Sequence, residues 1–136
     1  MPMGQEQNKA VVRALYEGLN QRDWSVLDES LASDYVHLSS GEYRVDREGL
    51  KAGIINNFLK AFPDLHVTLD EIIAEGDKVM VRWTQQGTHL GPFLDRPATG
   101  KFVTYSGINI FRLANGRIVE DTPYWDFRVL LKQIDG

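Results

Sequence analysis

The sequence contains no cysteine. This absence excludes a disulfide framework, a thiolate zinc site and a cysteine nucleophile, and it is compatible with a reducing compartment. No run of about 18 apolar residues could form a membrane-spanning helix. The first residues also lack the basic segment followed by an apolar run that marks an export signal. Together these absences predict a cytoplasmic protein that does not enter a membrane.

An excess of positive charge is also missing, because the formal net charge is −4. The chain therefore offers no electrostatic attraction for nucleic acid or for an anionic membrane surface. Its hydrophobic fraction of 43% is that of an ordinary globular protein, and 136 residues are enough to bury one core. We predict a single domain over residues 1–136 with neither kind of partner.

Several motifs of common enzyme classes are absent as well. The histidines at positions 37, 66 and 89 show neither an i, i+4 pair nor the HExxH spacing of a zinc site, so no metal is predicted. The chain has no phosphate-binding GxxxxGK[ST] and no GxSxG nucleophile elbow. Metal-dependent, phosphate-binding and serine hydrolase functions thus lack sequence support.

The N-terminal part of the chain has the periodicity of helices. Apolar residues at helical spacing predict an amphipathic helix over residues 5–21. Ser25 and Asp28 have the spacing of a capping box and predict a short helix up to residue 31. A short strand is expected at 35–38. Asp46 can cap a third helix over 47–59, which must end before Pro63.

From residue 66 onward the apolar period changes to two, which predicts strands. The runs 66–75, 78–88, 101–113 and 117–125 are separated by turn signals, of which Asn115-Gly116 is typical of a tight hairpin. The strands should therefore be antiparallel neighbours. Residues 89–100 contain two prolines and two glycines and predict an irregular loop. A short terminal helix is expected at 127–134, with Asp126 as its cap or bound to the backbone.

Alternation in the third of these strands bears on assembly. Val103, Tyr105, Gly107, Asn109 and Phe111 share one face, and residues 102, 104, 106, 108 and 110 share the other. Both faces are apolar enough to need a cover. The helices can cover one face, so the other predicts a homodimer formed through the sheet. A monomeric sedimentation profile at micromolar concentration would contradict this prediction.

The segments FPD, GDKV, RWT, GTHLG, SGINIFR and NGRIVED occur in this order between residues 62 and 121. With the closing WDF they resemble the SnoaL-like polyketide cyclases, or ester cyclases, of the nuclear transport factor 2-like superfamily. The resemblance implies an α+β cone in which three N-terminal helices pack on a curved antiparallel sheet. It further implies a deep pocket for a small apolar or polyketide-like molecule, a homodimer, and a cofactor-free intramolecular aldol ring closure.

The resemblance also exposes a departure at the expected active site. The aspartate that acts as acid and base in the cyclases aligns with Pro123, which cannot transfer a proton. The family's pocket glutamine and histidine align with Gly107 and Asn109, and a pocket asparagine aligns with His37. Asp121 lies two residues before Pro123 and hence on the same face of the strand.

Aldol chemistry needs a base beside a carbonyl and a donor for the enolate oxygen. The sequence hypothesis assigns Asp121 as base, His37 as its partner and Asn109 as oxyanion donor. Two alternatives remain open: Asp121 could be a rim acid paired with an arginine at 82, 112 or 117, and His37 could be a structural histidine. His89 could bind a ligand or fix a turn. The other candidate pocket residues are Tyr16, Trp24, Tyr35, Phe58, Trp83, Tyr105, Phe111, Pro123 and Trp125.

Three functions are compatible with these residues. The first is a cyclase, isomerase or lyase that acts on a small aromatic or polyketide-like carbonyl compound without a cofactor. The second is a non-catalytic dimer that binds a small ligand and has lost the family acid/base at Pro123. The third is a dimerisation domain with a filled core, which would show no cavity. The direction of the Asp121 side chain is the observation that bears most on the choice.

Overall fold

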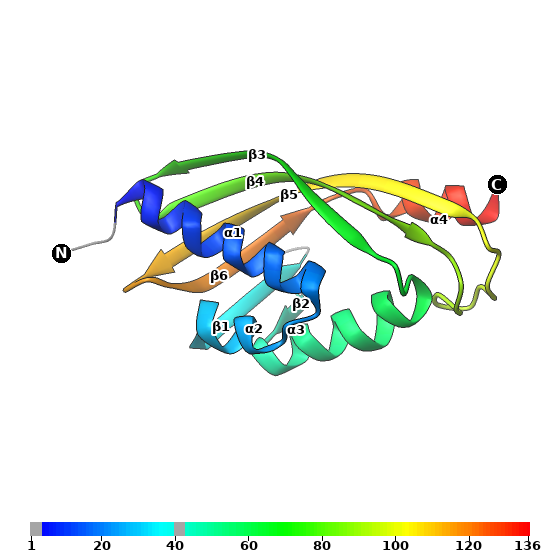
Figure 1. The fold of residues 1–136 in the computed structure, drawn as a ribbon, viewed down its shortest axis with the longest axis horizontal. Helices are drawn as coiled ribbons and strands as arrows, with labels where there is room; N and C mark the ends of the chain where they lie inside the picture. Colours follow the sequence, from blue (N-terminus) through cyan, green and yellow to red (C-terminus); the bar gives the residue numbers. More distant parts are fainter. Residues whose placement is uncertain (1–3, 40–42) are drawn as a thin grey trace.

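The computed structural model describes residues 4–39 and 43–136. Within these ranges, helices pack on one side of a curved sheet, which confirms the predicted α+β fold (Figure 1). The strand order in the sheet is β2-β1-β6-β5-β4-β3. In chain order the elements are α1 (Gln5–Gln21), α2 (Ser25–Ser30), β1 (Leu31–Ser39), β2 (Tyr43–Val45), α3 (Arg47–Gly53), η1 (Ile54–Leu59), β3 (His66–Glu75), β4 (Lys78–Thr88), β5 (Phe102–Ala114), β6 (Arg117–Tyr124) and α4 (Phe127–Asp135).

Helix α1 has the bounds that the sequence predicts, and it buries Val12, Leu15 and Tyr16 against the sheet. It ends at Arg22, whose backbone is left-handed with φ 60°. The Arg22 guanidinium donates hydrogen bonds to the backbone carbonyls of Leu19 at 2.9 Å and Leu65 at 2.8 Å. The end of α1 is thereby joined to the segment that leads into β3.

The predicted third helix is α-helical in its first part and π-helical in its second part. Asp46 caps its start by accepting a hydrogen bond from the Gly49 backbone N–H at 2.8 Å, as predicted. From Ile54 to Leu59, however, the helix is π-helical. Such segments often accompany functional sites because they redirect side chains. Here the π-helical turn contributes Ile54, Asn57 and Phe58 to the wall of a cavity.

The strands predicted from residue 66 onward are confirmed to within one residue at each end. Two features differ from the prediction. Strand β1 is longer than the expected 35–38, and it pairs in parallel with β6, with His37 opposite Asp121. The short strand β2 was not predicted. Strand β2 pairs antiparallel with β1, and it is too short to produce a periodic pattern in the sequence.

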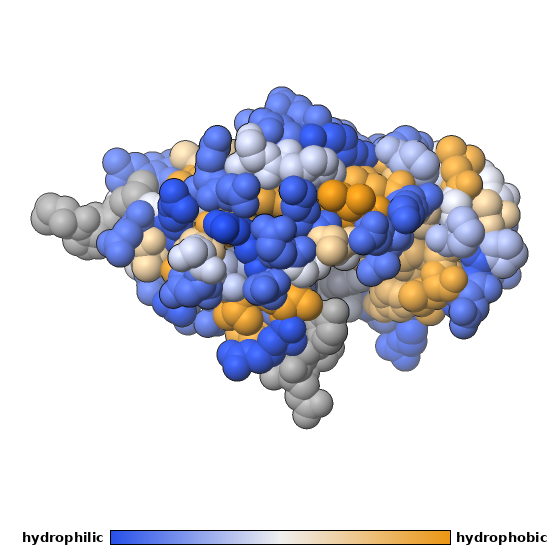
Figure 2. Space-filling model, turned by 90° about the horizontal axis from the view of Figure 1, so that it is seen from below, coloured by the Kyte–Doolittle hydropathy of each residue, from blue (hydrophilic) through white to orange (hydrophobic). Residues whose placement is uncertain are grey.

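The two faces of β5 differ strongly in burial. Val103, Tyr105, Asn109 and Phe111 are buried on the inner face, which meets the helices. On the outer face, Phe102 is 61% exposed and Ile110 is 38% exposed, and Tyr124 of β6 is 61% exposed. Seen from the side of the helices, the surface is mostly hydrophilic, with hydrophobic residues interspersed (Figure 2). The sheet therefore has one covered face and one face that remains open in the monomer.

Helix α4 begins after Asp126, whose side chain accepts a hydrogen bond from the Arg128 backbone N–H at 3.0 Å, as predicted. The helix reaches back to the start of β5. There the Gln133 side chain accepts a hydrogen bond from the Thr104 N–H at 2.9 Å and donates one to its carbonyl at 2.7 Å. Strand β6 pairs with β5 only as far as Ile108, so this amide binds backbone that β6 does not reach. Among the described helices, none is long and apolar enough to cross a membrane.

Candidate active site

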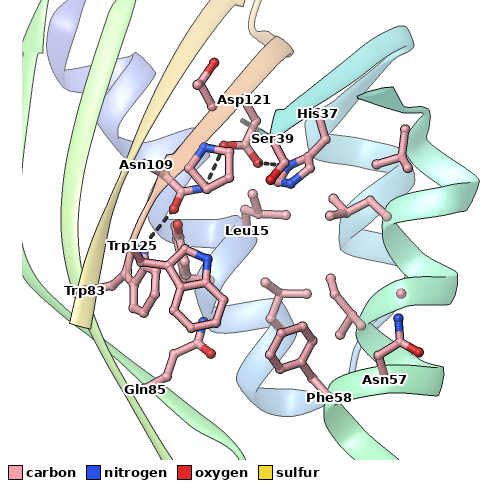
Figure 3. A pocket seen from close by; sticks show the side chains of 18 of the residues that line it. Leu15, His37, Ser39, Asn57, Phe58, Trp83, Gln85, Asn109, Asp121 and Trp125 are labelled. Atoms are coloured by element: carbon pink, nitrogen blue, oxygen red, sulfur yellow. Dashed lines mark hydrogen bonds and ion pairs between the residues drawn. The ribbon is translucent and has the colours of Figure 1, made fainter. Parts of the chain in front are cut away.

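A cavity of about 960 Å³ lies between the helices and the inner face of the sheet (Figure 3). This volume is within the range of small-molecule pockets. Its walls come from α1, β1, α3, η1 and strands β4 to β6, and most of the lining side chains are aliphatic or aromatic. Among the lining residues are Leu15, Leu50, Ile54, Phe58, Trp83 and Trp125. The described residues therefore form a largely apolar cavity on the inner face of the sheet.

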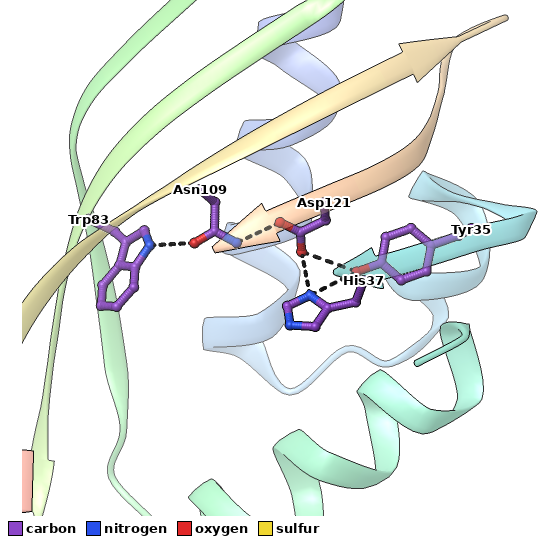
Figure 4. Close-up of polar contacts among 5 residues, drawn as sticks. All are labelled: Tyr35, His37, Trp83, Asn109 and Asp121. Carbon is purple, nitrogen blue, oxygen red and sulfur yellow. Dashed lines mark hydrogen bonds and ion pairs between the residues drawn. The ribbon is translucent and has the colours of Figure 1, made fainter. Parts of the chain in front are cut away.

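Asp121 is the centre of a buried polar cluster at one end of this cavity (Figure 4). Its side chain is buried, with only 5% of the residue exposed. One carboxylate oxygen, Oδ2, accepts a hydrogen bond from the Tyr35 hydroxyl at 3.1 Å and lies 3.1 Å from His37 Nδ1. The other, Oδ1, accepts a hydrogen bond from Asn109 Nδ2 at 2.6 Å. Three neighbours thus hold the carboxylate in one orientation.

The strands explain why these side chains meet. His37 of β1 is opposite Asp121 of β6 in the parallel register, so their side chains lie on the same face. Asn109 of β5 is opposite Pro123, two residues along β6 on that face. The register shift between β5 and β6 falls between Arg112 and Leu113, before Asp121 is reached. The strand is therefore regular here, and Asp121 lines the cavity.

The hydrogen bonds of the cluster define the state of the histidine ring. An ionised carboxylate can only accept hydrogen bonds, so the proton of a neutral His37 belongs on Nδ1, which faces Asp121. The lone pair is then on Nε2, which points away from the carboxylate (Figure 4). Burial, followed by the charge of Asp121, raises the pKa of Tyr35 well above that of an ordinary tyrosine. Tyr35 therefore remains a donor.

The cluster extends into an aromatic wall. Trp83 Nε1 donates a hydrogen bond to Asn109 Oδ1 at 2.7 Å, so Asn109 links the indole to Asp121. Trp125 stacks on Tyr105, with ring centroids 5.2 Å apart, and meets Trp83 at 6.2 Å. These rings occupy the space beside Gly107, where a Cβ atom would lie 2.5 Å from the Trp83 ring. The glycine therefore allows the two indoles to lie over β5.

Comparison with known proteins identifies the family of this chain. The family profile of the SnoaL-like polyketide cyclases matches residues 9–134. The chain belongs to this family. No curated protein sequence matches it.

Solved structures of similar proteins cover nearly the whole chain. IdmH from Streptomyces antibioticus, described as a candidate polyketide cyclase, is 31% identical, with a TM-score of 0.86 over 96% of this chain and 99% of its own. AclR from Streptomyces galilaeus, described as a candidate hydroxylase, is 29% identical, with a TM-score of 0.89 over 97% and 98%. TsrD from Streptomyces laurentii is 28% identical, with a TM-score of 0.85 over 97% of each chain.

Within this SnoaL-like chain, the arginines considered as partners of Asp121 lie elsewhere. Arg112 pairs with Glu120 at 3.4 Å. Arg82 lies 3.7 Å from Asp70 on the outer face. Arg117 donates to the backbone carbonyl of Asp28 at 3.4 Å. Asp121 is consequently a residue of the cavity wall and not a rim acid in an arginine pair.

The structure brings most of the predicted pocket residues of this SnoaL-like protein together. Tyr35 donates a hydrogen bond to Asp121 but is not among the described residues that line the cavity. Trp24 and His89, which the sequence hypothesis also placed in the lining, are not among the described lining residues either. Trp24 lies just before α2 and packs, partly buried, against the core. The predicted residues that do line the cavity are His37, Asn109, Asp121, Tyr16, Phe58, Trp83, Tyr105, Phe111, Pro123 and Trp125.

His89 instead fixes the start of the 89–100 loop. It is fully buried, its Nδ1 lies 2.9 Å from Thr99 Oγ1, and its ring packs on Phe62 with centroids 5.5 Å apart. Its backbone N–H and carbonyl bind Lys101 and Gly100. Among the described residues, no group accepts from or donates to His89 Nε2. The bonds to the loop support the alternative that His89 is a turn-fixing residue.

Sequence reasoning missed several residues of the cavity wall. Ser39, Asn57 and Gln85 are polar side chains of the lining that had not been proposed. For Gln85 a signal existed, since it lies two residues after Trp83 and therefore on the same face of β4. Asn57 lies in the π-helical turn, whose geometry helical periodicity does not predict.

The buried imidazole of His89 predicts a pH dependence of stability. Burial lowers the pKa of His89 below the ordinary value, with a smaller opposing effect of the Gly91 backbone. A lowered folded pKa means that protonation favours the unfolded chain, so stability is complete above about pH 6.5 and falls as the pH drops below it. Urea unfolding at pH 7.5 and pH 5 should show a loss on the order of 1 kcal/mol that the His89→Gln variant lacks.

The control for this measurement is His66→Gln, because His66 is exposed at the start of β3. That variant should keep the acid-dependent loss of the unmodified protein. An equal loss in the His89→Gln variant would show that other groups cause the pH dependence.

Proposed function

We propose that this SnoaL-like protein is a cofactor-independent cyclase that closes a ring in a small polyketide-like or aromatic carbonyl compound by an intramolecular aldol reaction. The observation that carries the proposal is the pair formed by His37 Nδ1 and Asp121 Oδ2, 3.1 Å apart in the wall of an apolar cavity. Family membership and the similarity to IdmH support the same type of reaction.

The contacts of Asp121 favour a different division of roles from the sequence hypothesis. Both oxygens of Asp121 already accept hydrogen bonds, so the carboxylate is better suited to orient His37 than to remove a proton itself. We therefore assign His37 Nε2 as the base. The His37 side chain is 17% exposed, so a ligand in the cavity can reach it.

The groups of the site can carry each proton transfer of this reaction. His37 Nε2 removes a proton from the carbon next to a substrate carbonyl, and the electron pair of the C–H bond forms the enolate. The enolate carbon attacks a second carbonyl carbon of the same molecule and forms the new C–C bond. The resulting alkoxide takes the proton back from the imidazolium. Asn109 Nδ2 has two N–H groups and gives one to Asp121, so the other can donate to the enolate oxygen.

The experiment that tests this function is hydrogen–deuterium exchange of a simple ketone. The methyl hydrogens of 2-acetylnaphthalene in D2O at neutral pH exchange through the same enolate, without any ring closure. We expect the protein to accelerate this exchange, followed by NMR, at least about 100-fold over an equal concentration of free imidazole. A rate equal to that of imidazole would contradict proton abstraction by this site.

A non-catalytic binding function is the second candidate, and Pro123 is the observation that favours it. Pro123 lies in the cavity wall, and the resemblance to the cyclases aligns it with the family acid/base. If the cavity only captures a ligand, 2-acetylnaphthalene should bind and quench the tryptophan fluorescence of Trp83 and Trp125 without exchanging its hydrogens. The exchange experiment thus separates the two functions.

We also propose that the protein acts in the cytoplasm as a homodimer formed through the outer face of the sheet. Phe102, Ile110 and Tyr124 are exposed there, and Ile73 on β3 is 51% exposed. Apolar residues that gather on one face support a contact with a second copy. We expect sedimentation at micromolar concentration to give the mass of a dimer and Ile110→Arg to give a monomer. A monomer before substitution would exclude this assembly.

A further inference from the structure

Gln85 is a polar residue at the opposite end of the cavity from His37 and Asp121. It lies on β4, two residues beyond Trp83, and both side chains line the cavity. Its cross-strand neighbour is Tyr105, whose hydroxyl donates a hydrogen bond to Gln85 Oε1 at 2.8 Å. In Figure 3, Trp83 and Trp125 lie between Gln85 and Asp121. The cavity therefore has two polar ends and an aromatic middle.

The bond from Tyr105 determines what Gln85 presents to the cavity. Tyr105 is only 3% exposed, and burial raises its pKa above that of an ordinary tyrosine, so the hydroxyl keeps its proton. Because the hydroxyl donates, the glutamine carbonyl is the acceptor and the Nε2 hydrogens remain. Among residues 4–39 and 43–136, no acceptor is bonded to Gln85 Nε2. This end of the cavity thus offers a neutral hydrogen-bond donor.

The strand geometry gives the spacing between the two ends. Asn109, which binds Asp121, and Tyr105, which binds Gln85, are four residues apart on the inner face of β5. At about 3.3 Å per residue, this separation is roughly 13 Å along the strand. The indole of Trp125 stacks on Tyr105 within this interval and gives the wall a flat aromatic surface. A ligand that spans the interval must be elongated, and a flat ligand can stack on this surface.

We propose that Gln85 determines specificity for the remote end of the substrate by donating a hydrogen bond from Nε2 to an acceptor oxygen. The substrate class is then an elongated, flat aromatic carbonyl compound with a second oxygen, a carbonyl or an ether or phenol oxygen, far from the reacting carbon. The reacting end lies at His37, and in this respect the inference rests on the proposed function. Gln85 is a binding residue and takes no part in the proton transfer.

The test compares two ligands that differ in one acceptor atom. 4′-Methoxyflavone and 4′-ethylflavone have nearly the same length and shape, but only the first has an oxygen at the remote position. Binding is measured by the quenching of tryptophan fluorescence. A neutral hydrogen bond contributes about 1 kcal/mol, so the unmodified protein should bind the methoxy compound about five-fold more tightly. In Gln85→Leu the ratio should fall to about one.

Gln86→Leu is the matched control, because Gln86 is the neighbouring glutamine on β4 and is exposed on the other face. It should retain the five-fold ratio. An unchanged ratio in Gln85→Leu would overturn the proposal. Tighter binding of 4′-aminoflavone than of 4′-methoxyflavone would also overturn the proposal, because the glutamine carbonyl would then face the cavity. Failure of both flavones to bind up to their solubility limit would exclude the substrate class.

This ratio is an equilibrium measurement and requires no turnover. A protein that shows the ratio but does not exchange the hydrogens of 2-acetylnaphthalene would support Gln85 as a binding residue and contradict the cyclase. Exchange without the ratio would support the cyclase and contradict the role of Gln85. The two proposals can therefore fail separately.

Discussion

Replacement of Asp121 by asparagine is expected to slow the exchange of 2-acetylnaphthalene by about 100- to 10,000-fold. The variant keeps the size of the side chain, but the asparagine amide can donate to His37 Nδ1. That bond stabilises the tautomer with its proton on Nε2, which then has no lone pair to accept a proton from the substrate. Because Tyr35 and Asn109 still surround the site, ligand binding should change much less than the rate.

His37→Gln should reduce the exchange to a similar extent, because it removes the base itself. The two substitutions act on one unit, so the double variant should be no slower than either single variant. His66→Gln is the control, since it removes an exposed imidazole that does not line the cavity and should leave the rate unchanged. Full activity of His37→Gln together with an inactive Asp121→Asn would instead assign the base to Asp121.

Gly107→Ala is expected to have the largest effect on stability among the conservative substitutions on the inner face of β5. The new Cβ atom would lie 2.5 Å from Trp83 Cζ2 and 2.6 Å from Trp125 Cβ, closer than atoms can approach without movement. Overpacking of this kind costs about 1–3 kcal/mol. Movement of Trp83 also breaks its 2.7 Å hydrogen bond to Asn109 and leaves a buried acceptor unsatisfied. Urea unfolding should therefore show a loss of about 3 kcal/mol.

The matched control is Ser106→Ala, the preceding residue on the outer face of β5, where the side chain is exposed. Its free energy of unfolding should change by less than about 0.5 kcal/mol. Equal stability of Gly107→Ala and the unmodified protein would show that the two indoles can shift at little cost. In that case the glycine would have no steric role in holding Trp83 beside Asn109.

Local patterns were sufficient to predict much of the fold. The apolar period of α1 and the hairpin signal at Asn115-Gly116 depend on neighbouring residues, and both predictions are confirmed. The alternation along β5 also indicated that Tyr105 and Asn109 share a face. The parallel pairing of β1 with β6 was not predictable in this way, because it joins residues 84 positions apart, as the bond between His37 and Asp121 illustrates.

The candidate site was predictable as a set of residues but not as a set of roles. Strand alternation and the resemblance to the cyclases identified Asp121, His37 and Asn109. Tertiary packing determines how many hydrogen-bond donors surround Asp121. Because both of its oxygens accept hydrogen bonds, we assign the base to His37 and not to Asp121. His89 shows the converse case, since a histidine beside a glycine-rich loop has the same local sequence whether it binds a ligand or fixes a turn.

The bonds between Gln133 and the backbone of Thr104 have a consequence for self-association. An unpaired strand edge offers free N–H and C=O groups to any other extended chain, and such edges are common starting points for aggregation. Here the amide of a helical side chain occupies one N–H and one C=O of β5 where β6 no longer pairs. The last helix therefore protects this part of the β5 edge against pairing with another chain, while the outer face of the sheet remains exposed.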